Sequence, residues 1–387
     1  MNASQKNIVV FRTKLLPYSE TFIKEQVLSY QEWSPILVGH FMLSDGIDLK
    51  DVNYVTFEKK YNTFSNFKRN FYKLIGFSPY CDFAMLNNIK PDLIHVHFGV
   101  DAVVNWPLLK KIQVPLIITL HGYDITIDKN WWKAGKEGIH LKKYPEKLNE
   151  IAKYENVNFI AVSQAVKEKA IEFGIPSDKI KISYIGIDLL NFSVSTNKFD
   201  NRKQILFIGR LVEKKGAHVL LDAFSKIKDK FPDHIITFIG DGPLKPQLYD
   251  QAHTLGVNVK FLGACSKEKI IEELHNTAVF CLPSIRAKNG DSEGFGLVIL
   301  EAAACGVPVV TSALGGATEG IVHGETGFRF GENNSDELAL YLDKLLSDPH
   351  LMKSMGQNGR EFVEKNFDIK KCTRSLEIIY EDIINGC

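Results

Sequence analysis

A chain of 387 residues is too long for one ordinary hydrophobic core and suits two domains of roughly equal size. Its composition, 45% apolar and 24% charged residues, is that of a folded globular protein and excludes a disordered chain. The net charge of +1 argues against a general nucleic-acid binder, so nucleic acid is not an expected partner. The charge is uneven, because residues 1–198 hold 25 Lys and Arg against 20 Asp and Glu, whereas the remainder holds 22 against 26.

Two further features bound the location and the chemistry. No apolar run approaches the length of about eighteen residues that crosses a bilayer, and the N-terminus lacks the pattern of a secretory signal, so a cytoplasmic location is expected. The six cysteines are scattered and form no C-x-x-C pair. Neither a disulfide framework nor a zinc site is therefore expected.

Short apolar runs rich in β-branched residues alternate along the chain with amphipathic stretches. Six such runs form a first series, and five form a second: residues 8–11, 36–38, 93–96, 116–120, 159–162 and 180–184, then 205–208, 235–239, 257–261, 279–282 and 307–310. This alternation is typical of parallel strands joined by crossover helices. The sequence predicts an α/β protein with two Rossmann-like, doubly wound domains that face each other across a cleft.

The polar stretch 190–202 has no apolar period and is the expected linker between the two domains. We therefore expect an N-terminal domain over 1–198 and a C-terminal domain over 199–367. Residues 368–387 include a periodic apolar pattern around Leu376, Tyr380 and Ile383. This last segment is predicted to be a helix that packs back on the N-terminal domain.

The strongest motif is Glu293-Gly294-Phe295-Gly296-Leu297-Val298-Ile-Leu-Glu301, which precedes Ala-Ala-Ala-Cys-Gly-Val-Pro-Val-Val. A helix is expected to begin near Gly296 and to end at Cys305-Gly306, where glycine permits a left-handed cap. Free N–H groups at the start of that helix would favour a phosphate. Glu301 lies on a largely apolar segment, so its carboxylate needs hydrogen-bond donors such as two ribose hydroxyls. The alternative is a glycine-rich turn with a solvent-facing glutamate.

Two more motifs directly follow expected strands, where ligands bind in doubly wound sheets. Gly209-Arg210-Leu-Val-Glu-Lys-Lys215-Gly216 would bring two cations to the diphosphate of a nucleotide, unless it is an ordinary surface loop. Gly240-Asp241-Gly242-Pro243 would allow close packing against a base or ribose, or it is a plain turn capped by Asp241.

Histidines mark the first half of the chain. His95 and His97 share one face of an expected strand, but no third ligand stands at a convincing spacing, so a metal site is not favoured. His97 either lines an acceptor pocket or is a satisfied core polar group. His121 opens a Gly-Tyr123-Asp124 turn after a strand and should project into the cleft, unless it is a buried structural histidine. Tyr123 and Asp124 are candidates for contacts to substrate hydroxyls.

The order G-R-L-x-x-x-K-G, G-D-G-P and E-G-F-G-x-x-x-x-E, followed by A-C-G-V-P-V-V, resembles family 4 of the retaining glycosyltransferases, which have the GT-B fold. Ser19-Glu20-Thr-Phe-Ile, His95-Val-His97-Phe-Gly99 and His121-Gly-Tyr-Asp124 are similar to the exopolysaccharide branch of that family, of colanic acid and amylovoran type. The usual glycine-rich turn after the first strand is absent, and residues 12–20 replace it. This departure weakens the case for acceptor phosphate contacts in the loop. Ser19 and Glu20 are acceptor candidates, and the alternative for Ser19 is an N-cap.

The resemblance implies sugar transfer from a nucleotide sugar with retention at the anomeric carbon and without a metal or other cofactor. The matching positions suggest that Arg210 and Lys215 hold the donor diphosphate. They place Glu293 on the sugar hydroxyls and Glu301 on the ribose, with His121 beside the sugar. Backbone N–H groups at Gly296, Leu297 and Val298 would bind phosphate, and Gly209, Gly240, Asp241, Gly294 and Phe295 would complete the donor site. No D-x-D occurs in the chain, which agrees with metal independence.

The donor base and sugar stay open between UDP-sugars and GDP-mannose, and the expected acceptor is a glycan or lipid-linked glycan of bacterial surface polysaccharide biosynthesis. Aromatic and basic residues interleave in 57–74 and again in 129–147. Each segment either lies on an anionic membrane surface at the inner face of the cell membrane or turns its aromatics to the core. Three alternative functions are open: a transferase with a small soluble acceptor, a sugar-nucleotide epimerase, and an inactive sugar-nucleotide-binding scaffold.

Overall fold

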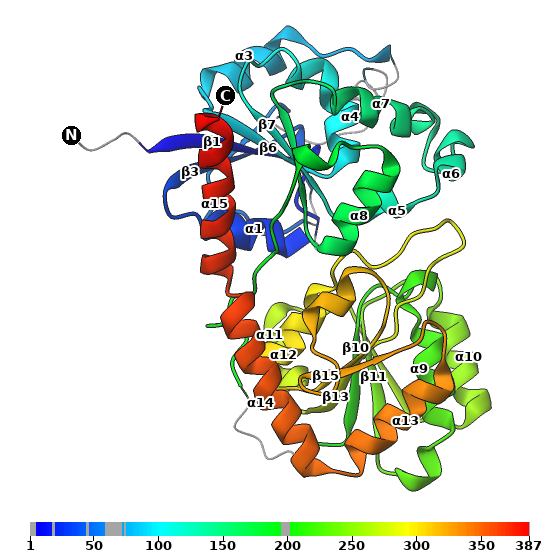
Figure 1. Cartoon of the computed structure of the whole chain (residues 1–387). Coiled ribbons are helices and arrows are strands. Elements are labelled where there is room, and N and C mark those ends of the chain that lie inside the picture. Colours follow the sequence, from blue (N-terminus) through cyan, green and yellow to red (C-terminus); the bar gives the residue numbers. More distant parts are fainter. Residues whose placement is uncertain are drawn as a thin grey trace. The chain divides into compact units, whose positions relative to one another are not determined.

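The computed structural model describes residues 5–17, 20–43, 46–58, 72, 75–194 and 202–386. The chain forms two compact units, one of Met1–Gly186 with Ile369–Cys387 and one of Ile187–Asp368. Each unit is built on its own parallel sheet (Figure 1). The chain enters the second unit earlier than the polar stretch at 190–202, because the N–H of Ile187 already donates to the carbonyl of Phe367, at 2.7 Å.

The first unit holds a seven-stranded sheet in the order β5-β3-β1-β6-β7-β8-β9. Every adjacent pair is parallel, and β1 lies between β3 and β6. All six expected strands are present. A parallel sheet is covered on both faces, so each central strand is a continuous apolar run that the sequence shows clearly. The strands are β1 (Lys6–Phe11), β3 (Trp33–Gly39), β5 (Tyr54–Thr56), β6 (Leu93–His97), β7 (Leu116–Leu120), β8 (Val157–Ala161) and β9 (Ile180–Ile182), with a separate pair β2 (Lys14–Leu15) and β4 (Phe41–Met42).

Helices follow the strands as crossover connections. They are α1 (Thr21–Leu28), α3 (Tyr80–Asn88), α4 (Gly99–Leu109), α5 (Tyr123–Thr126), α6 (Lys129–Lys133), α7 (Tyr144–Ile151) and α8 (Gln164–Phe173), and the C-terminal α15 (Ile369–Asn385) also belongs to this unit.

The C-terminal helix α15 is built into the core of the first unit. Leu376 and Tyr380 pack in one buried cluster with Ile8, Trp33 and Leu93 from the sheet. Glu377, a neighbour on the helix, is fully buried, and its Oε1 accepts the backbone N–H groups of residues 31, 32 and 33 at 2.8, 2.8 and 3.1 Å. A buried carboxylate is tolerated here because these donors replace its water.

The second unit holds a six-stranded sheet in the order β12-β11-β10-β13-β14-β15, again parallel throughout. Its strands are β10 (Gln204–Ile208), β11 (Ile235–Ile239), β12 (Val259–Gly263), β13 (Thr277–Leu282), β14 (Val309–Ser312) and β15 (Gly327–Phe330). Its helices are α9 (Ala217–Ser225), α10 (Lys245–Leu255), α11 (Lys267–His275), α12 (Leu297–Ala304), α13 (Ser335–Leu346) and α14 (Pro349–Asn366).

Glycines set both ends of α12. Gly296 is the N-cap with a left-handed φ of 80°, and Gly306 follows the helix with a φ of 73°. The N–H of Gly306 donates to the carbonyl of Ala303 at 2.9 Å, and that of Val307 donates to the carbonyl of Ala302 at 3.0 Å. This is the Schellman arrangement, which satisfies the last carbonyls of a helix.

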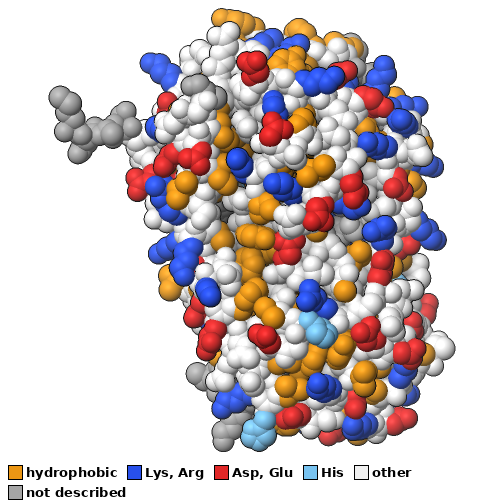
Figure 2. Space-filling view, in the orientation of Figure 1, with side chains coloured by type: hydrophobic (Ala, Val, Ile, Leu, Met, Phe, Trp, Pro, Cys, Tyr) orange, Lys and Arg blue, Asp and Glu red, His pale blue; other side chains and the backbone are white. Residues whose placement is uncertain are grey.

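Surface charge and the two aromatic, basic segments bear on whether the protein contacts a membrane. Acidic and basic side chains are interspersed over the face drawn in Figure 2. Among the described helices, none combines the length and apolarity needed to span a bilayer. In 129–147, Trp132 is fully buried, whereas Trp131 is half-buried and its indole donates to Glu137 at 2.9 Å. Most of 57–74 lies outside the described residues, namely 59–71, 73 and 74.

Candidate functional site

The two glycine motifs after β10 and β11 pack directly on each other. Gly240 has a φ of 121°, and a Cβ placed there would lie 2.1 Å from the carbonyl oxygen of Gly209. The N–H of Leu211 donates to the carbonyl of Asp241 at 2.9 Å, and the N–H of Leu244 donates back to Leu211 at 3.1 Å. Only a residue without a side chain fits at Gly240, since any larger one would meet the backbone of the neighbouring loop.

A second close approach brings the loop after β10 against the loop after β13. Gly216 has a φ of 63°, and a Cβ there would lie 1.8 Å from the carbonyl oxygen of Pro283. The N–H of Ile285 donates to the carbonyl of Lys214 at 2.8 Å. The three motif loops are therefore neighbours at one edge of the sheet, where the carboxyl ends of its parallel strands meet.

Two ion pairs cross between these loops. Lys215 Nζ lies 2.5 Å from Glu293 Oε2, and Lys214 Nζ lies 3.0 Å from Asp291 Oδ2. All four side chains are between 11% and 14% exposed, so these charges interact in a partly desolvated environment. The Lys214–Asp291 pair was not predicted. Lys214 directly precedes the predicted Lys215, and Asp291 lies two positions before the predicted Glu293, so each residue has the same charge as its predicted neighbour.

The ionisation state of Glu293 follows from its neighbours. Burial of the carboxyl raises its pKa, but Lys215 and then Lys214 lower it by more, with a smaller contribution from the hydroxyl of Ser284 at 3.4 Å. The net pKa of Glu293 lies below its ordinary value. Glu293 is therefore ionised at neutral pH and can accept hydrogen bonds from hydroxyl groups.

Arg210 and Asp241 differ from this pair because both are exposed. The guanidinium of Arg210 makes no hydrogen bond or ion pair with the residues that the structure describes. Asp241 Oδ1 accepts the N–H of Gly242 at 2.8 Å, which is the capped turn that the sequence left open as an alternative. Arg210 is thus available to an incoming anion, whereas Asp241 holds its own loop.

The N-terminus of α12 opens next to this group. Gly294, Phe295 and Gly296 are buried, and Leu297 and Val298 are half-buried. The first N–H groups of a helix have no acceptor within it, and no side chain caps this one. Glu301 is half-buried in the second turn of α12. The helix end and Arg210 therefore supply positive charge at this edge of the sheet, whereas Lys214 and Lys215 are each paired with a carboxylate.

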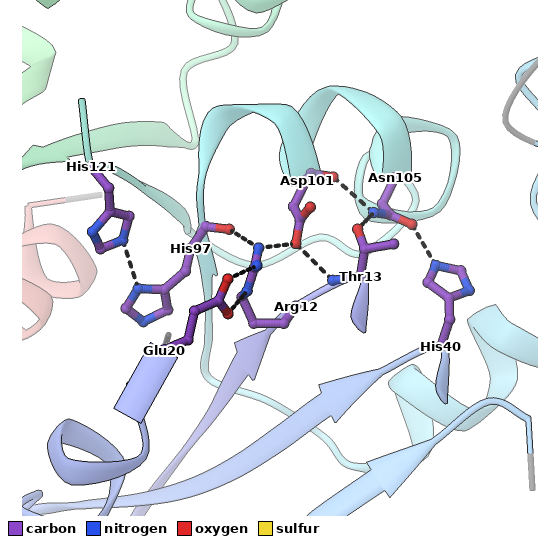
Figure 3. A network of polar contacts seen from close by, with 8 residues as sticks. All are labelled: Arg12, Thr13, Glu20, His40, His97, Asp101, Asn105 and His121. Atoms are coloured by element: carbon purple, nitrogen blue, oxygen red, sulfur yellow. Dashed lines mark hydrogen bonds and ion pairs between the residues drawn. The ribbon is translucent and has the colours of Figure 1, made fainter. Parts of the chain in front are cut away.

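In the first unit, a buried arginine organises the loop that follows β1 (Figure 3). Arg12 donates to both carboxylate oxygens of Glu20, at 2.9 Å from Nε and 2.6 Å from Nη2. Its Nη1 also binds Asp101, and its guanidinium lies 4.3 Å from the centre of the Phe98 ring. Glu20 is only 8% exposed, so the structure gives this acceptor candidate an ion-pairing position.

The same network extends to α4 and to His40, which lies between β3 and β4. Asp101 Oδ2 accepts the N–H of Thr13 at 2.7 Å, and Asn105 donates to the Thr13 hydroxyl at 2.8 Å. Asn105 Oδ1 also lies 2.6 Å from His40 Nε2. Arg12, Asp101 and Asn105 were not predicted as site residues. Asp101 and Asn105 are at least 88 residues from their partners Arg12 and Thr13, so these contacts depend on the pairing of β1 with β6.

The predicted residues after β6 and β7 do meet. His97 Nδ1 lies 3.1 Å from His121 Nε2 (Figure 3). His121 is half-buried, whereas His97 is 2% exposed, so a direct contact of His97 with an acceptor is sterically blocked. Asp124 is fully buried, and its Oδ2 accepts the backbone N–H of His121 at 2.9 Å. Burial raises the pKa of Asp124 to about 7.

The remaining acceptor candidates have separate surroundings. The hydroxyl of Tyr123 donates to Glu137 at 2.5 Å. Ser19 lies outside the described residues. His95 is held in the core between the hydroxyls of Thr119 and Tyr380, each 2.6 Å from one of its ring nitrogens. Both ring nitrogens are therefore occupied by these hydrogen bonds. Within the described part of the chain, no three His, Cys, Asp or Glu side chains are grouped as a metal site.

Comparisons with known proteins agree with this architecture. Residues 191–362 match the model for glycosyl transferases group 1, and residues 45–190 match the model for Glycosyltransferase Family 4. An uncharacterised glycosyltransferase of Methanocaldococcus jannaschii is 31% identical over 76% of this chain and 76% of its own length. The amylovoran biosynthesis glycosyltransferase AmsK of Erwinia amylovora is 30% identical over 76% of this chain and 72% of its own length.

Among solved structures, the crystal structure of HepE from Anabaena in complex with UDP superposes with a TM-score of 0.76 at 20% identity. The match covers 97% of this chain and all of that one, and it shows the GT-B fold. The family models and the two relatives show that the chain is a glycosyltransferase. The chain belongs to glycosyltransferase family 4.

Proposed function

We propose that the chain is a hexosyltransferase that moves a sugar from a nucleotide-sugar donor to a glycan or lipid-linked glycan in bacterial surface polysaccharide biosynthesis. The transfer retains the anomeric configuration and needs no metal. AmsK, whose name assigns it to amylovoran biosynthesis, supports the polysaccharide role. The complex of HepE with UDP favours a UDP-sugar over GDP-mannose as the donor.

One observation carries the proposal for the donor site. Lys215 and Glu293 are in direct contact at 2.5 Å beside the N-terminus of α12. In a nucleotide sugar the diphosphate and the sugar hydroxyls are covalent neighbours, so the residues that bind them should be neighbours as well. A lysine for the phosphate next to an ionised carboxylate for the hydroxyls meets that requirement.

The proposed reaction breaks the bond between the anomeric carbon and the diphosphate oxygen and forms a bond from that carbon to an acceptor hydroxyl oxygen. Negative charge develops on the departing diphosphate. Arg210, Lys215 and the N–H groups of Leu297 and Val298 stabilise that charge. With retention, the acceptor approaches on the face that the diphosphate leaves, so the hydroxyl proton can pass to a departing phosphate oxygen.

The second unit is therefore proposed to hold the donor. Glu301 binds the ribose hydroxyls, and the tight contact between Gly209 and Gly240 shapes the floor beneath the nucleotide. The first unit is proposed to contribute acceptor-side groups, with His121 and Tyr123 as the candidates that are not fully buried.

A peripheral membrane contact is a separate part of the proposal. Within 129–147 its described support is reduced to the half-buried Trp131 and to exposed residues such as Ile139 and Lys142, since Trp132 is fully buried. Flotation with vesicles of anionic lipid at physiological salt tests it. Recovery of the protein with the vesicles is expected, and its absence from them would leave only the soluble form.

The rival functions separate in one experiment on the full chain. The purified protein is incubated with UDP-glucose, UDP-N-acetylglucosamine or GDP-mannose and an extract of glycan and lipid-linked acceptors. A transferase releases nucleoside diphosphate together with a new glycoside. An epimerase would instead interconvert nucleotide sugars without transfer, and an inactive scaffold would leave them unchanged. Transfer to small soluble acceptors alone would show that the acceptor is not a glycan or a lipid-linked glycan.

Donor identity is tested by thermal shift with UDP, GDP, ADP and TDP. A ligand at a hundred times its Kd stabilises a protein by roughly 2.7 kcal/mol, so the preferred base should stand out. We expect UDP to give the largest shift. A larger shift with GDP would reassign the donor.

A further inference from the structure

His97 and His121 stand at the carboxyl ends of two adjacent strands, β6 and β7, and their ring planes are nearly parallel, at an interplanar angle of 22° with centres 5.3 Å apart (Figure 3). His97 Nδ1 and His121 Nε2 are 3.1 Å apart. A neutral imidazole carries one N–H and one lone pair. One histidine must therefore donate to the other, and the direction of that bond fixes the tautomer of both rings.

Both rings are neutral at physiological pH. Burial lowers the pKa of His121 well below its ordinary value, and the positive charge of Arg12 lowers it further. Burial also lowers the pKa of His97 well below its ordinary value, and its neighbours His95 and His121 add to the effect. The question is thus which of two neutral arrangements the surroundings favour.

The second nitrogen of His97 decides it. His97 Nε2 is enclosed and has no hydrogen-bond partner among the described residues. A buried N–H without an acceptor is rarer in proteins than an acceptor with an unused lone pair. The favoured arrangement therefore leaves Nε2 unprotonated and places the proton of His97 on Nδ1, from which it donates to His121.

The consequence falls on His121. Its Nε2 accepts from His97, so its own proton resides on Nδ1. That nitrogen makes no hydrogen bond with the described residues and, unlike His97 Nε2, is not enclosed. We infer that His97 is a positioning residue that fixes His121 as an Nδ1–H donor directed at a substrate oxygen, such as a sugar hydroxyl. The substrate part of this inference rests on the proposed function; the tautomer part does not.

The surroundings keep His121 in this orientation. The rings of Phe22 and Phe98 lie 5.2 and 4.3 Å from the His121 ring, and they offer it no strong hydrogen-bond acceptor. Its backbone N–H is tied to Asp124 at 2.9 Å. A donor held in one direction loses little freedom when a substrate binds, which is the advantage of a preorganised site.

The tautomer is measurable without any substrate. Long-range proton–nitrogen correlation spectra of the full chain labelled with nitrogen-15 distinguish a protonated from an unprotonated ring nitrogen, with His121→Gln providing the assignment. We expect His121 to be protonated at Nδ1 and unprotonated at Nε2 at neutral pH. The reverse pattern, or a mixture of the two tautomers, would overturn the inference whether or not the protein transfers sugars.

Two substitutions then test the positioning role. His97→Asn keeps an amide N–H close to the place of Nδ1, whereas His97→Leu removes the donor and leaves an apolar side chain in the core. We expect His97→Asn to keep the Nδ1–H tautomer of His121 and most of kcat. His97→Leu should lose the tautomer preference and lower kcat by about tenfold at similar donor KM.

Thermal unfolding of both variants shows whether the fold survives. If His97→Leu does not fold, the spectra of the wild-type chain and of His97→Asn still decide the matter. Equal losses of kcat in two folded variants, or an unchanged tautomer in His97→Leu, would contradict the positioning role.

Discussion

Lys215 Nζ lies 2.5 Å from Glu293 Oε2, and this partly buried ion pair joins the loop that follows β10 to the loop that precedes α12. The two residues come from motifs 78 positions apart in the chain. Their contact joins two sequence patterns in one candidate site, where the proposed function assigns the cation to the phosphate and the carboxylate to the sugar. The following predictions depend on that arrangement and on the buried groups that support it.

Removing Lys215 should abolish most of the turnover without unfolding the protein. A preorganised group that stabilises developing charge contributes roughly a hundredfold to a thousandfold in rate, so Lys215→Ala should lower kcat by that amount. The fold should persist because Lys214 still lies close enough to lower the pKa of Glu293. Steady-state rates and circular dichroism check both statements.

The matched control is Lys226→Ala. Lys226 also forms an ion pair, with Asp336 at 2.6 Å, but at the opposite end of α9. Its loss should leave kcat nearly unchanged. Near-normal turnover of Lys215→Ala, or equal effects of the two variants on kcat, would contradict a role of Lys215 in stabilising the leaving diphosphate.

Gly240→Ala should disrupt the contact between the two glycine loops. The new Cβ would lie 2.1 Å from the carbonyl oxygen of Gly209, so one of the two loops must move. Both the affinity for nucleotide and the stability of the protein should therefore decrease. Gly324→Ala is the control, since Gly324 also has a left-handed φ but no atom within 4 Å of an added Cβ. That variant should be destabilised by only about 1 kcal/mol and keep its affinity for nucleotide. Equal melting temperatures for both variants would argue against the steric explanation.

Asp124 should make the stability of the protein depend on pH. Burial raises its pKa from 3.8 to about 7, so between these values the folded state holds a proton that the unfolded state has lost. This contribution therefore weakens stability as pH rises through that window, and it is absent in Asp124→Asn. The free energy of unfolding of the variant relative to wild type should increase from pH 4 to pH 7 by at most roughly 4 kcal/mol. Denaturant titrations at several pH values measure the difference, and a constant offset across the window would speak against a neutral buried Asp124.

The central strands of both sheets could be predicted because each is buried on both faces and so reads as an unbroken apolar run. The strands β5 and β15 were missed. Tyr54 of β5 is 41% exposed, and β15 is only four residues long, so neither carries a distinct pattern. The start and end of α12 were predictable because Gly296 and Gly306 mark positions that need a left-handed backbone.

The proximity of residues in the candidate site was predictable where charge and glycine follow a strand within one motif, as at Lys215 and Glu293. It was not predictable where a partner depends on sheet order. Arg12 and Asp101 are 89 residues apart, and their contact follows from the pairing of β1 with β6. Nor does the local sequence show that His97 is enclosed while His121 is not, because the two lie on similar strand ends.

The central claim is that the charge on the leaving diphosphate is neutralised by Arg210, Lys215 and the N-terminus of α12 alone. The most direct measurement is the initial rate of sugar transfer by the metal-stripped protein in the presence of excess EDTA. The account predicts a rate equal to that of the untreated protein. Loss of transfer in EDTA, with recovery on addition of Mg²⁺ or Mn²⁺, would contradict it.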